Sequence, residues 1–461
     1  MRITDIQACE VRPGRLVEWT LSPAAVKAAV RTEDARPPAY IQEMHIRRAK
    51  RLRDKGLFVP TWIGIVFDMR GPLDLDVLQE ALRAWTARHE TLRSGFRWAG
   101  ESGDELRRFT LDAGEVALHR EDAGDFPDGG ELSRHLENRF HTVADALRWP
   151  NLIYAAVLRG DSTSVYMAFD HSNVDAYSLF RLPADVHELY TAGLEGRSPE
   201  EPAPVASYVD FCELERADAD RVVDGHPAVS HWREFIQRCG GQLPGFPLDL
   251  GLTAGEPPAR QRVLCEPLAG PSEAAAFEAY CRPYGGSLAG VLAATARIVG
   301  ELGGPQVYRT VVPFHTRTKS RWSESVGWYV GGVPVEVETD LCRTFPDALR
   351  TVRAELKAHR ALASVPMNRV LSLLGADQTT DPDLFSAVSY IDTRAIPGAD
   401  QWSEQRAHGL IRPSHSDQVF MWVNRLPDGL WLTSRFPDTD VADKVMRLYT
   451  ERLRDHITST V

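Results

Sequence analysis

The chain has 461 residues, of which 43% are hydrophobic and 25% are charged, so it can bury the cores of two or three globular domains or of one large two-lobed unit. Its formal net charge of -11 excludes a sequence-independent grip on nucleic acid, because neutralising phosphates requires clustered Lys and Arg side chains. The first residues lack an apolar signal core, and no apolar run approaches the ~20 residues that cross a bilayer. The sequence therefore predicts a cytoplasmic protein without a membrane span.

The first part of the chain alternates between strand and helix patterns. Residues 45–55 hold six Lys or Arg side chains, which is typical of a solvated helix face or of a docking site for an acidic protein. Apolar alternation predicts a strand over residues 60–67, and an apolar stripe with Asp74 or Asp76 as N-cap predicts the helix that follows. A further helix and two apolar strands are expected at residues 131–140, 152–158 and 164–169.

A polar loop follows the second of these apolar strands and reads Asp170-His171-Ser172-Asn173-Val174-Asp175-Ala176-Tyr177-Ser178. A strand end is a rigid support, and an imidazole can accept a proton near neutral pH, so His171 is the candidate general base. An ordinary loop explains the same residues, because His171 can bond to the backbone and Asp175 can be the N-cap of a helix over residues 176–189. The loop alone does not decide between these interpretations.

The second part of the chain follows a stretch rich in Gly, Pro and Glu. We expect residues 193–206 to link an N-terminal lobe, 1–192, which carries the His171 loop, to a C-terminal lobe, 207–461. Strands and helices interleave in both lobes, which predicts two α/β units rather than one barrel. Helices are expected at 208–217, 228–239, 288–302 (capped by Ser287) and 345–362, and strands at 307–312, 333–337, 385–391, 419–426 and 429–434. The last helix is expected to bury a stripe of four side chains, Val441, Val445, Leu448 and Leu453.

Five separated segments match the motif blocks of one known superfamily in order and spacing. Residues 88–96, Arg-His-Glu-Thr-Leu-Arg-Ser-Gly-Phe, are similar to its Arg-His-Glu-x-Leu-Arg-Thr-x-Phe block, and residues 170–176 fall where it carries His-His-x-x-x-Asp-Gly. Residues 39–45, 207–211 and 326–334 resemble its Ser-x-x-Gln, Tyr-x-Asp-Phe and Val-Gly-x-Phe-Val-Asn blocks. Over nearly its whole length the chain resembles the condensation domains of nonribosomal peptide synthetases and the free-standing acyltransferases associated with polyketide lipids.

The resemblance implies an α/β fold of two lobes like chloramphenicol acetyltransferase, which meet in a V with a central tunnel and His171 in its middle. It implies a stand-alone acyltransferase that moves an acyl group from a thioester to a hydroxyl or amine of a small molecule, in the biosynthesis of a specialised metabolite, an antibiotic or a lipid. The acyl donor would be carried on the phosphopantetheine of an acyl or peptidyl carrier protein acting in trans, or on coenzyme A. No bound cofactor and no metal are expected.

The resemblance also implies roles for individual residues. His171 matches the catalytic histidine, and Asp175 matches an aspartate that pairs with an arginine to fix the loop. Arg317 is the candidate partner by position, with an ordinary surface arginine as the alternative. Trp328 and Tyr329 are candidates for the wall of the acyl channel or for the core. The other neighbours of the candidate base are Asp170, Ser172, Ala176, Tyr177 and Ser178, and backbone donors near the loop are expected to hold the oxyanion.

Two residues depart from the family pattern. Asp170 stands where the family has its first histidine, and its carboxylate can orient a neighbouring group or raise the basicity of His171. Ala176 replaces a glycine, so a left-handed backbone is either not required there or strained. The change at Asp170 leaves open a catalytically silent platform that recruits a carrier protein or a tailoring enzyme. A third alternative is a relative that epimerises or dehydrates a carrier-bound substrate, which would need the same base.

Overall fold

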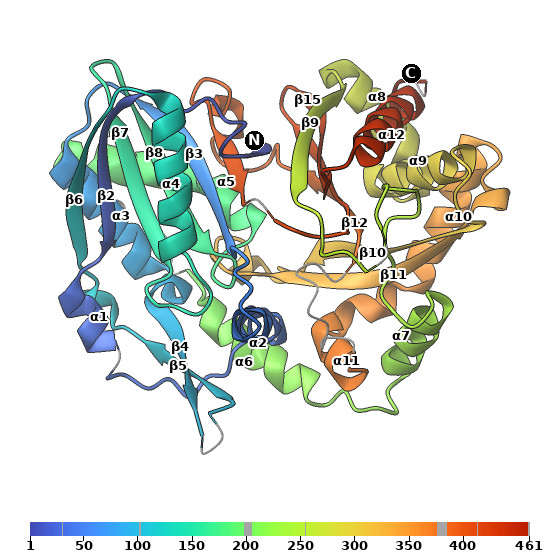
Figure 1. Cartoon of the computed structure of the whole chain (residues 1–461), viewed down its shortest axis with the longest axis horizontal. Helices are drawn as coiled ribbons and strands as arrows, with labels where there is room; N and C mark the ends of the chain where they lie inside the picture. The colour runs from blue at the N-terminus through green and yellow to red at the C-terminus, as the bar shows by residue number, and fades with distance from the viewer. Residues whose placement is uncertain are drawn as a thin grey trace.

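Two β-sheets, one in each half of the molecule, organise the chain (Figure 1). The computed structural model describes residues 1–29, 31–100, 103–197, 205–253, 255–375, 385–412 and 414–459. In spatial order, the first sheet contains β1 (Arg2–Asp5), β13 (His408–Ile411), β3 (Trp62–Arg70), β8 (Ser162–Asp170), β7 (Leu152–Leu158), β2 (Gly14–Leu21) and β6 (Leu118–Phe126). The second contains β11 (Val330–Glu338), β10 (Val307–His315), β12 (Ala387–Asp392), β14 (Phe420–Leu426), β15 (Gly429–Pro437) and β9 (Gln261–Ala269). A separate ribbon pairs β4 (Ser94–Ala99) with β5 (Glu105–Thr110).

Helices cover the two sheets and the join between them (Figure 1). The helices of the first half are α1 (Pro23–Ala29), α2 (Tyr40–Asp54), α3 (Leu75–Arg88), α4 (Gly129–Val143) and α5 (Ala176–Leu194). Later in the chain come α6 (Tyr208–Ala219), α7 (Pro227–Arg238), α8 (Pro271–Cys281), α9 (Ser287–Glu301), α10 (Phe345–Ala358), α11 (Met367–Leu373) and α12 (Asp440–Thr458). None of the helices in the described ranges combines the length and the apolar character that crossing a bilayer requires.

The central strands of the first sheet are buried on both faces. Alternate side chains of a strand point to opposite faces, and β3 sends Ile63, Ile65 and Phe67 into a core with α3 and α5. The intervening Trp62 and Val66 pack into a second core with α4. This two-sided burial explains why the central strands are nearly continuous apolar runs in the sequence. It also gives the loop after β8 a rigid base.

The orientation of α12 differs from the expected one. Its buried apolar side chains are Ala442, Met446, Tyr449, Leu453 and Ile457, whereas Val441 and Leu448 are 39% and 37% exposed. Both sets recur with a helical period, so the pattern alone does not define which face packs inward. The rotation follows from Tyr449, whose hydroxyl lies 2.7 Å from that of Thr295 on α9. A smaller difference concerns Ser287, which is the first residue of α9 and not its cap.

One strand joins the two halves of the molecule. The expected division at residues 193–206 stays a prediction, and residues 198–204 of that linker lie outside the described residues. β13 comes far beyond this division, yet it lies in the first sheet, parallel to β1 and antiparallel to β3, with Gly409 opposite both Ile3 and Ile65. The segment before β13 is also attached to β3, because the amide of Asp68 donates to the carbonyl of Gln405. The expected C-terminal lobe therefore contributes a strand to the N-terminal sheet.

Candidate active site

A cavity of about 300 Å³ lies between the two sheets, and His171 forms part of its wall. The first sheet contributes residues of β1, β3 and β13, and the second contributes residues of β10, β11, β12, β14 and β15. Helices α2, α5 and α11 close the remaining sides. Most lining side chains are apolar, among them Ile63, Leu179, Val311, Met367, Phe420 and Trp422, so the space suits an apolar ligand.

His171 follows the last residue of β8 directly, and its ring is held in one orientation. Nδ1 lies 2.8 Å from the carbonyl oxygen of Val174, so Nδ1 carries the proton and Nε2 is the basic nitrogen. The indole of Trp328 stacks on the imidazole, with the ring centroids 4.0 Å apart. Burial lowers the pKa of His171 to about 4, and smaller electrostatic contributions from Arg412 and His45 act in the same direction. At neutral pH the imidazole is therefore uncharged, and Nε2 has no hydrogen-bond partner in the described part of the chain.

Asp175 and Arg317 fix the end of the loop. Nη1 and Nη2 of Arg317 donate to the two carboxylate oxygens of Asp175 over 2.6 and 3.0 Å. Burial acts to raise the pKa of Asp175, but the Arg317 guanidinium outweighs it and holds that pKa below its usual value. Asp175 is also the N-cap of α5, because it accepts a hydrogen bond from the amide of Ser178 at 2.8 Å. Both oxygens of the Asp175 carboxylate therefore accept structural hydrogen bonds, and the group is not available for catalysis.

The backbone amides of residues 171–173 are occupied. The amide of His171 donates to the carbonyl of Thr61, and that of Asn173 donates to the carbonyl of Asp170. The amide of Ser172 donates to the side chain of Asp170 at 2.9 Å. These three amides cannot also bind an oxyanion. These three are therefore not the backbone donors that the resemblance implies. Ala176, the first residue of α5, lines the cavity.

The remaining sequence-selected residues divide between the cavity and its surroundings. Trp328 lines the cavity, whereas the adjacent Tyr329 is buried in the core and its hydroxyl donates to Ser325 at 2.7 Å. Ser178 accepts from Nη2 of Arg317 at 2.9 Å, and the same guanidinium lies over the ring of Tyr177. Both therefore support the Asp175 pair and do not face the candidate base.

The position of Ala176 needs no glycine. Among the described residues, Arg406 is the one non-glycine residue with a positive φ, and Ala176 begins α5 with an ordinary backbone. The departure from the family's glycine is therefore accommodated without strain.

A family model described as Condensation domain matches residues 62–414. The chain belongs to the condensation-domain family. Among curated relatives, Acyltransferase PapA3 of Mycobacterium tuberculosis is 26% identical over 96% of this chain and 93% of that protein. Trehalose-2-sulfate acyltransferase PapA2 of the same organism is 27% identical over 98% and 96% of the two chains. A solved structure of PapA2 acyl transferase has a TM-score of 0.89 at 25% identity and covers 100% of this chain and 99% of that one.

More distant solved structures share the fold of this condensation domain. The condensation domain of the Monacolin K polyketide synthase MokA has a TM-score of 0.68 at 18% identity, over 93% of this chain and 98% of that one. The expected α/β fold and the expected acyltransferase class are confirmed. The curated relatives bear the names of enzymes, so they support the acyltransferase and not the catalytically silent platform.

Sequence reasoning missed the part that α2 plays in this condensation domain. The basic segment at residues 45–55 falls mostly on this helix, which lies at the base of the join (Figure 1). Four of its residues, Ile41, Met44, His45 and Arg48, line the cavity. Their spacing of i, i+3, i+4 and i+7 is one face of a helix and could have been found in the sequence. The helix precedes the residues that the family model matches.

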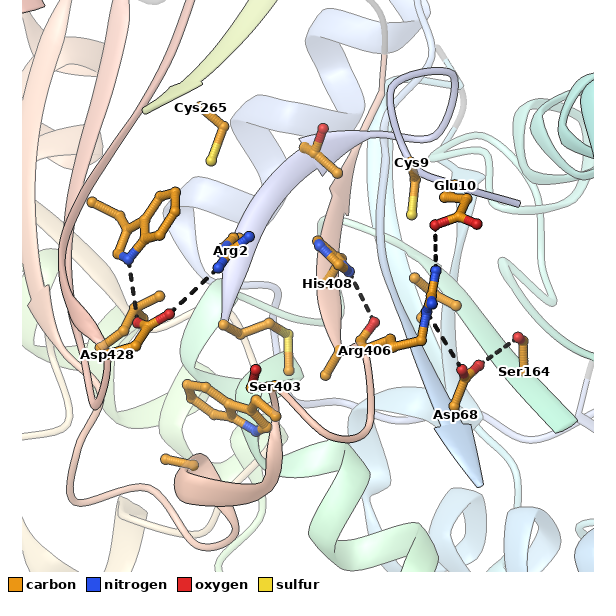
Figure 2. A pocket seen from close by; sticks show the side chains of 18 of the residues that line it. Arg2, Cys9, Glu10, Asp68, Ser164, Cys265, Ser403, Arg406, His408 and Asp428 are labelled. Atoms are coloured by element: carbon orange, nitrogen blue, oxygen red, sulfur yellow. Dashed lines mark hydrogen bonds and ion pairs between the residues drawn. The ribbon is translucent and has the colours of Figure 1, made fainter. Parts of the chain in front are cut away.

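The condensation domain has a second, larger cavity of about 710 Å³, whose lining includes Arg2 of β1 and His408 of β13 (Figure 2). Charged side chains line it and pair with one another: Arg2 lies 3.5 Å from Asp428, and Arg406 binds both Glu10 and Asp68. None of the sequence-selected site residues is in its wall. Although this cavity is the larger of the two, we take the cavity beside His171 as the candidate active site.

Proposed function

We propose that this condensation-domain acyltransferase moves an acyl group from a thioester to a hydroxyl, with His171 as the general base. The observation that carries the proposal is the state of the imidazole. Its Nδ1 proton is committed to the carbonyl of Val174, which leaves the lone pair of Nε2 for a proton on the attacking group. The ring stands at the wall of an apolar cavity, where an acyl chain can be held beside it.

The proposed reaction needs one base and correct placement. The acceptor oxygen attacks the thioester carbonyl carbon while its proton passes to Nε2 of His171. The tetrahedral intermediate then collapses, the carbon–sulfur bond breaks, and the thiolate leaves and takes the proton back from the imidazole. The amide at Ala176 and the positive end of α5 are the proposed oxyanion donors, because the amides of residues 171–173 are occupied.

The low pKa of His171 defines how much the base contributes. An imidazole with a pKa of about 4 is uncharged at neutral pH, so Nε2 is unprotonated, but such a weak base provides little driving force for proton removal. General-base catalysis supplies roughly 10²- to 10⁴-fold, and we place this enzyme in the lower part of that range. Orientation of the two reactants in the cavity is then the larger contribution.

The cavity and the relatives support a proposal for the donor and acceptor classes. The donor is proposed to be an acyl chain on the phosphopantetheine of a carrier protein or on coenzyme A, since both present a thioester. A sugar hydroxyl is the first acceptor class to test, because the name of the relative PapA2 specifies trehalose-2-sulfate. For the same reason we propose that an ester, and not an amide, is the product.

The test is turnover by the full chain with acyl-coenzyme A and acyl-carrier-protein donors and disaccharide acceptors. Mass spectrometry detects the ester, and a thiol reagent measures the released sulfur. His171→Ala is expected to lower kcat/KM by roughly 10²-fold or more. His408→Ala is the matched control, because its Nδ1 also lies 2.8 Å from a backbone carbonyl, that of Arg406, but in the other cavity (Figure 2). Equal losses in the two variants would contradict a specific role for His171.

A further inference from the structure

Asp170 is a fully buried carboxylate at the end of β8. Its Oδ1 accepts from the amide of Ser172, and its Oδ2 lies 3.2 Å from Nε2 of His45 on α2. Burial acts to raise the pKa of Asp170, but His45 and the hydrogen bonds to the carboxylate outweigh it and hold the pKa below its usual value. An ionised carboxylate at this depth is tolerated only with a partner, and His45 is that partner.

His45 is connected to the candidate base through one aromatic ring. Its imidazole meets the indole of Trp328 edge to face, with centroids 5.2 Å apart and planes at 89°. The same indole stacks on His171, at 4.0 Å and 24°. Asp170, His45, Trp328 and His171 therefore form a continuous series of contacts. The indole is held between two imidazoles, one from α2 and one from the loop.

Resting on the proposed function, we propose that His45 and Asp170 are a positioning pair for His171. The carboxylate orients His45, His45 fixes the plane of Trp328, and Trp328 fixes the ring that must present Nε2 to the acceptor. The loop has a carboxylate where the family pattern has its first histidine, and α2 supplies an imidazole beside it. This assignment explains why Asp170 is compatible with an active enzyme.

A second contact shows that α2 holds the whole loop. Nε2 of Gln42, three residues before His45 and on the same side of the helix, donates to the carbonyl of Ser172 at 2.8 Å. Arg108 donates to Oε1 of the same glutamine at 3.2 Å and so fixes its amide. The glutamine anchors the loop through a backbone carbonyl and is not one of the residues of the aromatic series. It therefore offers a control that loosens the loop and leaves the aromatic series in place.

The charges around His171 predict in which direction its pKa changes when His45 is replaced. Arg412, after β13, and His45, on α2, both lower its pKa, whereas Asp175 and Arg317 neutralise each other at the far end of the loop. His45→Gln retains a nitrogen that can donate to Asp170 but removes the electrostatic contribution of His45 that lowers the pKa of His171. The pKa of His171 should therefore rise in this variant. A role limited to folding would not move it.

The experiment compares His45→Ala, His45→Gln, Asp170→Asn and the double variant His45→Ala/Asp170→Asn, with Gln42→Ala as the control. We expect kcat to fall roughly tenfold to a hundredfold in His45→Ala and Asp170→Asn, with KM nearly unchanged. The double variant should be no slower than the slower single variant, because the pair acts as a unit. His45→Gln should recover most of the kcat that His45→Ala loses. In the pH profile of kcat/KM for this variant, the fall in acid should begin at a higher pH than in the parent.

A second readout does not depend on turnover. Diethyl pyrocarbonate reacts with an uncharged imidazole nitrogen, so its rate of reaction at His171 against pH, followed by mass spectrometry, reports the pKa and access of Nε2. The pH profile of this reaction should shift in His45→Gln and stay in place in Gln42→Ala. The proposal is overturned if His45→Ala leaves both kcat and the pH profile of the diethyl pyrocarbonate reaction unchanged. It is also overturned if the loss of kcat in His45→Ala equals that in Gln42→Ala. If the parent protein turns over no thioester, the proposed function fails. The pH profile of the modification at His171 still tests whether His45 and Asp170 position His171.

Discussion

Replacing Arg317 by alanine tests how the two lobes hold the candidate base. Arg317 follows β10 of the second sheet, and its partner Asp175 is the N-cap of α5, which packs on the first sheet. It donates to both carboxylate oxygens at 2.6 and 3.0 Å, and also to Ser178 Oγ at 2.9 Å and to the carbonyl of Ser325 at 3.2 Å. The side chain of Arg317 is only 4% exposed. Water therefore cannot replace these bonds without opening the join.

The expected loss follows from what remains around Asp175. Its carboxylate keeps the amide and the hydroxyl of Ser178 at 2.8 Å and the amide of Tyr329 at 3.1 Å. Removing one partner of a buried ion pair costs about 3–5 kcal/mol. Because three donors still solvate the charge, we expect Arg317→Ala to lower the free energy of unfolding by about 3 kcal/mol. Arg317→Lys keeps the charge but not the two-pronged geometry, and it should cost less.

The sign of the pH dependence gives a second check. Burial acts to raise the pKa of Asp175, but Arg317 holds it below the value in the unfolded chain. The ion pair therefore contributes its full stability at pH values above the unfolded pKa, and this contribution is lost as the pH falls through the lowered pKa of the folded state. Urea unfolding, followed by tryptophan fluorescence, should therefore show the full difference between parent and Arg317→Ala at pH 7 and a smaller one in acid. A loss below about 1 kcal/mol at pH 7, which is the scale of a surface pair, would refute the reasoning, as would a difference that grows in acid.

Three further changes test the cavity and its walls. Because burial lowers the pKa of His171 to about 4, kcat/KM should stay level through the neutral range and fall only near that value; a midpoint near the ordinary value of 6.5 would contradict it. In Gly327→Ala the new Cβ would lie 2.3 Å from the ring of Tyr208, so the free energy of unfolding should drop by about 1–3 kcal/mol, whereas Gly160→Ala meets nothing within 4 Å and should be neutral in the same urea titration. Gly409→Val narrows the cavity beside β1. For each methylene of the acyl donor that can no longer be buried there, the transition state loses ~0.8 kcal/mol of hydrophobic binding free energy, which lowers kcat/KM about fourfold. A mixture of donors of different chain lengths should then give shorter products, and an unchanged product distribution would exclude this wall from the acyl site.

The local features of the site could be predicted because their signals are local. Residues 152–158 and 164–169 lie in strands, and Asp175 caps the helix that begins at Ala176, as a short polar side chain before an apolar run indicates. The resemblance to the family added Arg317, which pure spacing could not relate to Asp175 over 142 residues. The role of His171 as the base stays a prediction.

Features that depend on distant partners were not predictable. Trp328 and Tyr329 are neighbours with similar side chains, and only the packing of the second lobe decides that the first meets His171 while the second enters the core. His45 meets Asp170 across 125 residues, in a segment where charge suggested a solvated face. The four residues of β13 show no strand pattern of their own, because their place comes from the edges of β1 and β3.

The position of β13 has a consequence for the synthesis of the protein. β1, made first, sits at the edge of its sheet next to β13, and β3 has β13 on one side and β8 on the other. On the ribosome, these N-terminal strands must wait until residues 408–411 have emerged from the exit tunnel before this part of the sheet can close. A nascent chain stopped anywhere before that point carries two open strand edges beside a row of isoleucines, which is a template for aggregation. We therefore expect the released N-terminal half to need a chaperone, although it contains the imidazole on which the proposed chemistry depends.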